Sequence, residues 1–225
     1  MDVAAEIPLA LLRHSSIQAV RLVGSRADGR SHEFSDWDFA VETEDFASAA
    51  DDLTHLVASL HPLAGQWDPF ASHACYMLMF PGPTKVDLLF LDQHRQWAPA
   101  WSPSPGNLQA IDRHFWDWIV WLEQKRSGGH EATLKTGFGH LFELMLKPMG
   151  VVSEPGSVSE AIDAYVAARD ELERRFGVSV LRELEAAVRP AVTRRQVRRA
   201  ANDTRLTFPK RWPSEVVPSC GGFRR

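Results

Sequence analysis

Two aspartates one residue apart are the side chains of this sequence best suited to chemistry. Asp36 and Asp38 stand at positions i and i+2, where an apolar run begins at Trp37. If that run is a strand, both carboxylates project from the same face and can share hard divalent cations. A calcium loop is excluded, because no Gly and Glu follow at the spacing such a loop requires. The alternatives are a structural turn or a site that has lost its activity.

A third carboxylate comes from a later apolar stretch. Asp87 is the only acid in the segment 85–91, which otherwise reads as a strand. A charge buried in a sheet is costly unless it is paired or bound to a metal. We therefore expect Asp87 to lie beside a cation.

A glycine and a serine follow the first strand-like run. Gly24 and Ser25 come directly after Ile17 to Val23, and a brief helix is expected to begin at Ser25. Such a turn lets backbone N–H groups and a hydroxyl approach phosphate oxygens without an intervening side chain. Arg26 or Arg30 would supply positive charge. The alternative for both arginines is a scaffolding role at the solvent boundary.

Together these residues resemble the nucleotidyltransferase superfamily, which includes polymerase beta, the minimal nucleotidyltransferases and the antibiotic adenylyltransferases. The family pattern is Gly-Ser, a gap, Asp-x-Asp, and a third Asp on a later strand. It is met here by Gly24, Ser25, Asp36, Asp38 and Asp87. The resemblance covers roughly the first 95 residues. It implies a mixed-sheet core, two magnesium ions, and transfer of a nucleotide from a nucleoside triphosphate to a hydroxyl.

The resemblance also implies a role for each residue. Asp36 and Asp38 would share both magnesium ions, while Asp87 would bind the ion beside the nucleophile and is one candidate for the general base, a role that the sequence does not assign to a single carboxylate. The nucleotide-binding residues would be Gly24, Ser25 and Arg26. ATP is the expected co-substrate.

Length and composition are those of an ordinary globular protein. The 225 residues suffice for one large domain or two modest ones, and 44% are hydrophobic while 24% are charged. Cys75 and Cys220 are far apart and match neither a disulfide framework nor the spacing of zinc ligands. Both are expected to be free thiols without a special role. Neither a basic leader nor an apolar run long enough to span a membrane is recognised. The expected location is the cytoplasm.

The sequence predicts an α/β (α+β) fold with a mixed sheet flanked by helices, followed by a C-terminal helical bundle. The segment Gln96 to Gly106 is rich in Pro and Ser and reads as a boundary. The expected division is residues 1–98 as a nucleotidyltransferase catalytic domain, 106–205 as a helical domain, and 206–225 as a partly ordered tail.

Hydrophobic periodicity predicts the elements. The expected strands are Ile17 to Val23, Trp37 to Glu42, Cys75 to Phe80 and Thr84 to Leu91, the last two joined as a hairpin. The expected helices of the first half are Ala4 to His14 and Glu44 to Leu60.

Four helices are expected in the second half. The first follows Asn107 as N-cap, the second runs from about Glu131 to Lys147, the third begins with a Ser157/Glu160 capping box, and the fourth covers about Val180 to Ala200. Pro190 is expected to kink or split the fourth.

Candidates for contact with an acceptor are weaker. Asp112, Asp117 and Glu143 offer carboxylates for a cationic acceptor, with surface exposure as the alternative. Aromatic residues offer the walls of a pocket, with a place in the core as the alternative. They are Trp97, Trp101, Trp116, Trp118 and Trp121.

Charge is distributed unevenly. Residues 189–225 contain ten Lys and Arg against Asp203 and Glu215, a local excess of +8 within a chain of net charge −4. This end either faces an anion such as a triphosphate or nucleic acid, or forms a solvated helix face and a tail.

Three hypotheses for function follow. The first is magnesium-dependent transfer of AMP from ATP to a hydroxyl of a small molecule, with an aminoglycoside-like antibiotic as the first acceptor and antibiotic resistance as the role. The second places the hydroxyl on a protein or an RNA, which the basic segment favours. The third is an inactive nucleotide-binding or interaction module.

Overall fold

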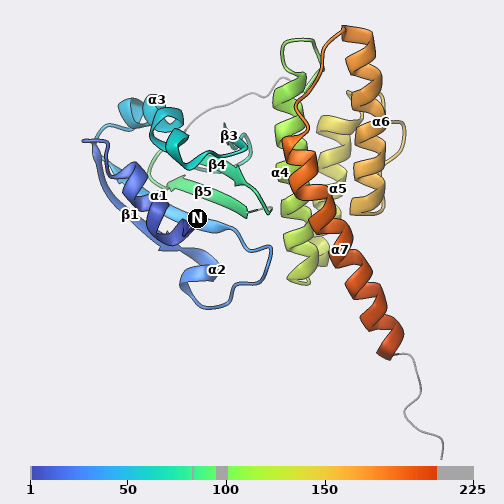
Figure 1. Cartoon of the computed structure of the whole chain (residues 1–225), viewed down its shortest axis with the longest axis horizontal. Coiled ribbons are helices and arrows are strands. Elements are labelled where there is room, and N and C mark those ends of the chain that lie inside the picture. Colours follow the sequence, from blue (N-terminus) through green and yellow to red (C-terminus); the bar gives the residue numbers. More distant parts are fainter. Residues whose placement is uncertain (1, 83, 95–100, 207–225) are drawn as a thin grey trace, which may run out of the picture. The chain divides into compact units, whose positions relative to one another are not determined.

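The computed structural model describes residues 2–82, 84–94 and 101–206, with side chains as far as Arg194 (Figure 1). The chain divides into two compact units, Met1–Thr193 and Arg194–Arg225. The first unit contains the sheet and the helices up to the start of the last one. The predicted tail, 206–225, lies outside the described residues except for Leu206, and the predicted domain division stays a prediction.

A five-stranded mixed sheet forms the first half. The strands are β1 (Ile17–Val23), β2 (Trp37–Thr43), β3 (Ala64–Trp67), β4 (Ala74–Phe80) and β5 (Thr84–Phe90), in the order β1-β2-β5-β4-β3. The β2/β5 pair is parallel and the other three pairs are antiparallel. The mixed sheet, four predicted strands and the β4/β5 hairpin are confirmed. β3 was not predicted.

Helices α1 (Val3–Leu11) and α3 (Phe46–Val57, continued by a 3₁₀ turn, η1, Ala58–Leu60) cover one face of this sheet (Figure 1). Alternation along β5 explains which side chains they meet. Val86 and Leu88 are fully buried in the apolar cluster that includes α1 and α3. Lys85 and Asp87 are offset by one residue, so they project from the opposite face.

The second half consists of α4 (Leu108–Ser127), α5 (Glu131–Leu141), a π turn η2 (Phe142–Leu146), α6 (Val158–Phe176) and α7 (Glu183–Leu206). A second apolar cluster joins the helices of this half, and it includes Met79 of β4 and Ala64 of β3. The face of the sheet that carries Asp87 is therefore the one that meets the helical half.

Two predicted helix signals have different outcomes. Ser157 caps α6 as predicted, since its Oγ accepts from the backbone N–H of Glu160 at 3.2 Å. Pro190, by contrast, does not split the fourth helix, because α7 runs through it without interruption. Cys75 is buried in β4, and Cys220 lies outside the described residues.

Among the helices that the structure describes, none combines the length and the apolar character needed to cross a bilayer. The basic cluster at the end of the chain is described only in part. Arg189 is paired with Asp163 and Glu185, both at 3.1 Å, and the side chains of residues 195–225 lie outside the description.

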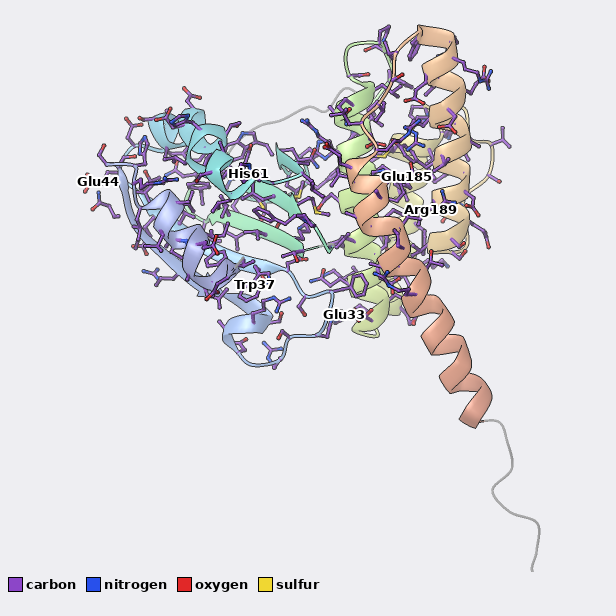
Figure 2. All side chains as sticks on the ribbon, viewed as in Figure 1. Glu33, Trp37, Glu44, His61, Glu185 and Arg189 are labelled. Carbon is purple, nitrogen blue, oxygen red and sulfur yellow. The ribbon has the colours of Figure 1, made fainter. Side chains whose placement is uncertain are left out.

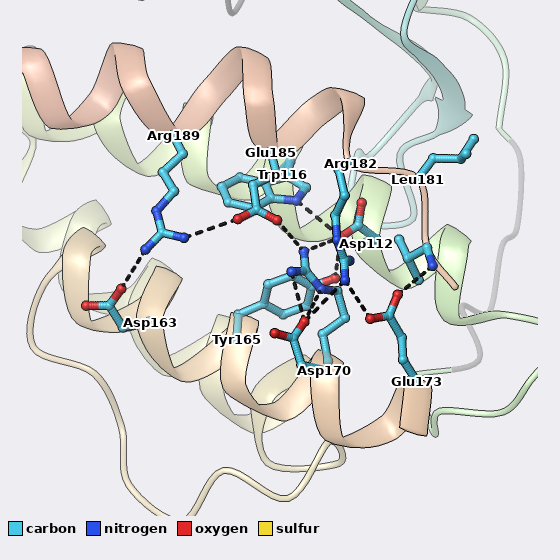
Figure 3. A network of polar contacts seen from close by, with 12 residues as sticks. Asp112, Trp116, Asp163, Tyr165, Asp170, Glu173, Leu181, Arg182, Glu185 and Arg189 are labelled. Atoms are coloured by element: carbon cyan, nitrogen blue, oxygen red, sulfur yellow. Dashed lines mark hydrogen bonds and ion pairs between the residues drawn. The ribbon is translucent and has the colours of Figure 1, made fainter. Parts of the chain in front are cut away.

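A buried polar network joins three helices of the second half (Figure 3). Asp112 of α4 has no exposed surface, and its Oδ1 accepts from Tyr165 Oη at 2.7 Å and from Trp116 Nε1 at 3.2 Å. Arg169 of α6 lies 3.5 Å from the same oxygen and donates to Glu185 of α7 at 2.8 Å. The network holds α4 against α6 and the start of α7.

We expect Asp112→Ala to lower the free energy of unfolding by about 3–5 kcal/mol, because it leaves the buried guanidinium and hydroxyl without their shared acceptor. Asp163→Asn is the control. The Asp163 side chain is 67% exposed and pairs only at the surface, so a change within about 0.5 kcal/mol is expected. Urea unfolding of both variants measures the difference, and equal effects would contradict a supporting role for the network.

Candidate active site

The three aspartates predicted from the sequence are brought together. β2 and β5 are parallel neighbours in which Asp38 lies directly beside Asp87, and Asp36 precedes β2 by one residue. One carboxylate oxygen of each residue lies within 4.8 Å of the others. Asp36 and Asp87 are buried and Asp38 is half-buried, so the group opens to one side.

Gly24 lies against this group. β1 pairs with β2 so that Val23 is opposite Asp38, which places Gly24 at the end of β1 beside the carboxylate. Its φ of +70° is in the left-handed region, and a Cβ there would be 2.4 Å from Asp38 Oδ2. Backbone conformation and space therefore both require glycine. Gly24 is exposed and Ser25 of α2 (Gly24–Ala27) is half-buried, so this turn is open to a ligand.

Arg26 supports the segment that carries Asp36. Its guanidinium donates to the backbone oxygens of Ser35 at 2.7 Å and Asp36 at 3.0 Å. It also lies 4.2 Å from the ring centroid of Trp37, which is labelled in Figure 2. Burial lowers the pKa of Arg26, and the Asp36 carboxylate opposes that shift. Arg30 is exposed and paired with Asp28, as the scaffolding alternative supposed.

The structure adds Lys85, which the sequence analysis did not single out. Its ammonium is buried and donates to Asp87 Oδ1 at 2.6 Å and Oδ2 at 2.5 Å. The same nitrogen is 3.7 Å from Asp36 Oδ2. The signal was present, because residues i and i+2 of a strand share a face. The cation expected beside Asp87 is thus supplied by its own strand.

Burial governs the ionisation of the group. It raises the pKa of Asp36 to about 6, against the attraction of Lys85, and it also raises the pKa of Asp38, with Asp87 adding to the effect. Burial alone would lower the pKa of the Lys85 ammonium, but Asp36 and Asp87 raise it well above its usual value. Lys125 of α4 acts on Asp36 and Asp38 as a further positive charge.

Helix α4 brings a fourth carboxylate. Asp117 is 8% exposed, and its Oδ1 is 3.9 Å from Lys85 Nζ. That oxygen has no hydrogen-bond partner among the described residues, and burial raises the pKa of Asp117 to about 8. Surface exposure was therefore the wrong alternative for Asp117. It was also wrong for Asp112, which belongs to the bundle core, and right for Glu143, which pairs with Lys147 in solvent.

A cavity of about 710 Å³ adjoins this carboxylate. Asp117 and Lys85 line it, together with residues 68–71 and parts of α4 and α5. Trp118 and Trp121 contribute aromatic walls, as the pocket hypothesis supposed. The other tryptophans of the described residues do not line it.

The remaining tryptophans have other surroundings. Trp116 is fully buried in the bundle core, in line with the alternative reading. Trp101 stacks on Phe70 with ring centroids 5.8 Å apart, so it backs a residue of the cavity wall. Trp97 lies outside the described residues.

The residues of the triad fit a metal ion. Their donor atoms are all carboxylate oxygens, which hard divalent cations prefer. Asp36 Oδ1 is buried and has no hydrogen-bond partner within the described part of the chain. A buried acceptor of this kind is costly unless a donor or a cation satisfies it.

Comparisons with known proteins add little. No family model and no curated protein matches the chain. A search of solved structures finds an aminoglycoside 6-adenyltransferase from Bacillus subtilis, at 11% sequence identity and a TM-score of 0.30, with 84% of this chain and 95% of that chain covered. A TM-score this low carries no argument for function, which must come from the site itself.

Gly24→Ala and Gly29→Ala form a matched pair that tests the contact with Asp38. Both glycines have a φ near +70°, but a Cβ at Gly29 would meet nothing within 4 Å. Each variant should lose about 1 kcal/mol of stability from the left-handed backbone. Only Gly24→Ala should displace the Asp38 carboxylate and weaken Mn²⁺ binding, by about tenfold or more. Equal Mn²⁺ titrations of the two variants would show that the contact has no consequence.

Asp117→Asn should change how stability depends on pH. In the folded chain Asp117 keeps its proton up to a pKa of about 8, whereas the unfolded chain releases it near ~3.9. Between these values the folded state binds more protons, so the free energy of unfolding of the wild type falls as the pH rises. In buffer with EDTA, urea unfolding should show Asp117→Asn more stable than wild type at pH 8 by about 2 kcal/mol or more, with a smaller difference at pH 5. Parallel pH profiles would contradict this.

Proposed function

We propose that this protein is a magnesium-dependent nucleotidyltransferase, which moves AMP from ATP to a hydroxyl of a small molecule. The observation that carries the proposal is the group formed by Asp36, Asp38 and Asp87 on two adjacent parallel strands, beside an open turn at Gly24. The sequence pattern that resembles nucleotidyltransferases is supported by this geometry, since β1 ends opposite Asp38 and Asp38 lies beside Asp87.

The carboxylates would hold two magnesium ions, which when bound supply positive charge at the attacking and leaving oxygens. In the reaction the acceptor oxygen bonds to the α-phosphorus while the bond to the departing pyrophosphate breaks. Asp87 would take the hydroxyl proton. Asp36 and Asp38 would help to hold both ions, a role taken from the family resemblance.

The nucleotide would enter at the turn between β1 and α2. Gly24 exposes backbone there, and Ser25 offers a hydroxyl for the β and γ phosphates. Arg26 would act in two ways, since its hydrogen bonds already position Asp36 and its charge lies near the same carboxylates. Selection of adenine is taken from the family resemblance, because no described residue can be assigned to the base.

The acceptor would occupy the cavity beside Lys85 and Asp117. Aromatic walls suit a hydroxylated molecule that carries an amine, because the ring faces attract a cation and the oxygens of Asp117 can accept its hydrogen bonds. An aminoglycoside-like antibiotic remains the first acceptor to test, and antibiotic resistance the proposed role. Transfer to a protein or RNA, and an inactive binding module, remain alternatives. A cytoplasmic location stays a prediction.

Calorimetric titration with non-hydrolysable ATP and GTP analogues tests the proposal. We expect the ATP analogue to bind with Mg²⁺ and to lose at least about tenfold in affinity, ~1.4 kcal/mol, when Mg²⁺ is removed or Asp36 and Asp38 are both replaced by Asn. The control neutralises Asp51 and Asp52, two exposed acids of α3, which should leave binding unchanged. Binding of neither analogue by the wild type, or an equal loss in both double variants, would contradict the site.

Acceptors are then screened with labelled ATP, Mg²⁺ and a panel of hydroxylated antibiotics. Transfer of label to a panel member would identify the acceptor class. Label on none of them, while the analogue binds normally, would reject the antibiotic but leave the enzyme class standing.

A further inference from the structure

The Lys85 ammonium lies among three buried carboxylates but forms hydrogen bonds with only one of them. It donates to both oxygens of Asp87, at 2.5 and 2.6 Å. The nearest oxygens of Asp36 and Asp117 are 3.7 and 3.9 Å away, beyond hydrogen-bonding distance. Lys85 therefore has two further carboxylates within 4 Å that it could reach as hydrogen-bond acceptors.

The Asp117 oxygen that faces Lys85 is an unused acceptor. Asp117 is 92% removed from solvent, and Oδ1 has no hydrogen-bond partner in the described part of the chain. A buried acceptor left in this state is costly, so a second arrangement that satisfies it is expected to lie close in free energy. Lys85 is the donor that can reach it.

We propose that Lys85 has two docking positions, on Asp87 when the triad holds no metal and on Asp117 when Asp87 binds a metal ion. The inference rests on the proposed function, because it assumes that the triad is a metal site. It assigns Asp117 a positioning role: this residue of α4 receives the lysine and so releases Asp87.

Electrostatics gives the reason for a move. An ammonium that occupies both Asp87 oxygens and a divalent cation bound to the same carboxylate would repel each other at very short range. Because N–H···O distances are ~2.7–3.2 Å, Nζ needs to move only about 1 Å to reach Asp117, by rotation of its flexible stem. An ammonium in contact with Asp117 would favour loss of the proton that burial otherwise keeps on this residue, and the proton would pass to solvent. The buried ammonium would then be paired with a carboxylate in both positions, which avoids the cost of an isolated charge.

This arrangement would link the cavity to the metal site. Asp117 and Lys85 both line the cavity, whereas Asp87 belongs to the triad. A metal ion on Asp87 would therefore repel the Lys85 ammonium toward Asp117 and the wall of the cavity. Metal binding at the triad would therefore change the charge on the cavity wall.

Mn²⁺ titrations without nucleotide, with free Mn²⁺ read by electron paramagnetic resonance, test the proposal. Asp117→Asn should bind Mn²⁺ about tenfold more weakly than wild type, because an amide is a poor partner for the displaced ammonium. The control is Asp68→Asn, which neutralises another carboxylate of the same cavity and should change affinity less than about twofold. Unchanged affinity in Asp117→Asn, or an equal loss in Asp68→Asn, would overturn the proposal.

A double-variant cycle separates positioning from other effects. With Lys85→Met there is no ammonium to receive, so adding Asp117→Asn should cost less than about twofold. A loss in this background as large as in the wild type would mean that Asp117 acts on the metal directly, and would overturn the proposal. If Lys85→Met does not fold, Lys85→Gln takes its place in the cycle, and the comparison of Asp117→Asn with Asp68→Asn decides by itself.

Failure of the inference and failure of the proposed function give different results. If the wild type does not bind Mn²⁺, both are wrong. If the wild type binds Mn²⁺ and Asp36→Asn weakens it while Asp117→Asn does not, the metal site stands and only the two positions of Lys85 are rejected.

Discussion

The ion pair between Lys85 and Asp87 is the interaction on which the candidate site depends. A sheet that buries acidic side chains between itself and a helical half carries a large desolvation cost, and positive charge within the same layer reduces it. Lys85 provides that charge from the same strand as Asp87, with both oxygens engaged. Because one ammonium serves several carboxylates, the site keeps an excess of negative charge where a divalent cation would bind.

The helical half places the remaining charges around that pair. Asp117 and Lys125 both belong to α4, whose position is held by the buried contacts of Asp112 with α6. Asp112 and Asp117 of this helix have different surroundings. Asp112 is anchored within the bundle through Oδ1, which accepts from Tyr165 and Trp116. The Asp117 oxygen that faces Lys85 has no hydrogen-bond partner among the described residues. The contacts of Asp112 with α6 thus help to position the side of α4 that carries Asp117, as sites held by a supporting shell generally require.

The triad was predictable from the sequence because strand periodicity is simple. Asp36 and Asp38 share a face by spacing alone, and Asp87 stood out as an acid in an apolar strand. The same rule applied to Lys85 would have found its pairing with Asp87. β3 was missed because its four residues, which include Gly65, carry too little alternating pattern to be read as a strand. The sequence left Asp112 and Asp117 open between an acceptor contact and the surface. The reason is that α4 is buried on most sides, polar residues included, so the sequence pattern did not separate exposed from buried acids.

Gly24 and Lys85 show how the two kinds of constraint combine at one carboxylate layer. Gly24 is demanded by shape, because the Asp38 carboxylate fills the space of a side chain and the backbone is left-handed. Lys85 is demanded by charge, because Asp87 has to be paired in a buried layer. Only glycine meets the steric requirement at position 24, whereas the Lys85 ammonium can pair with more than one neighbouring carboxylate. The contact between β1 and β2 therefore fixes the position of the Asp38 carboxylate. On β5, Asp87 could exchange the Lys85 ammonium for a metal ion without a change in the backbone.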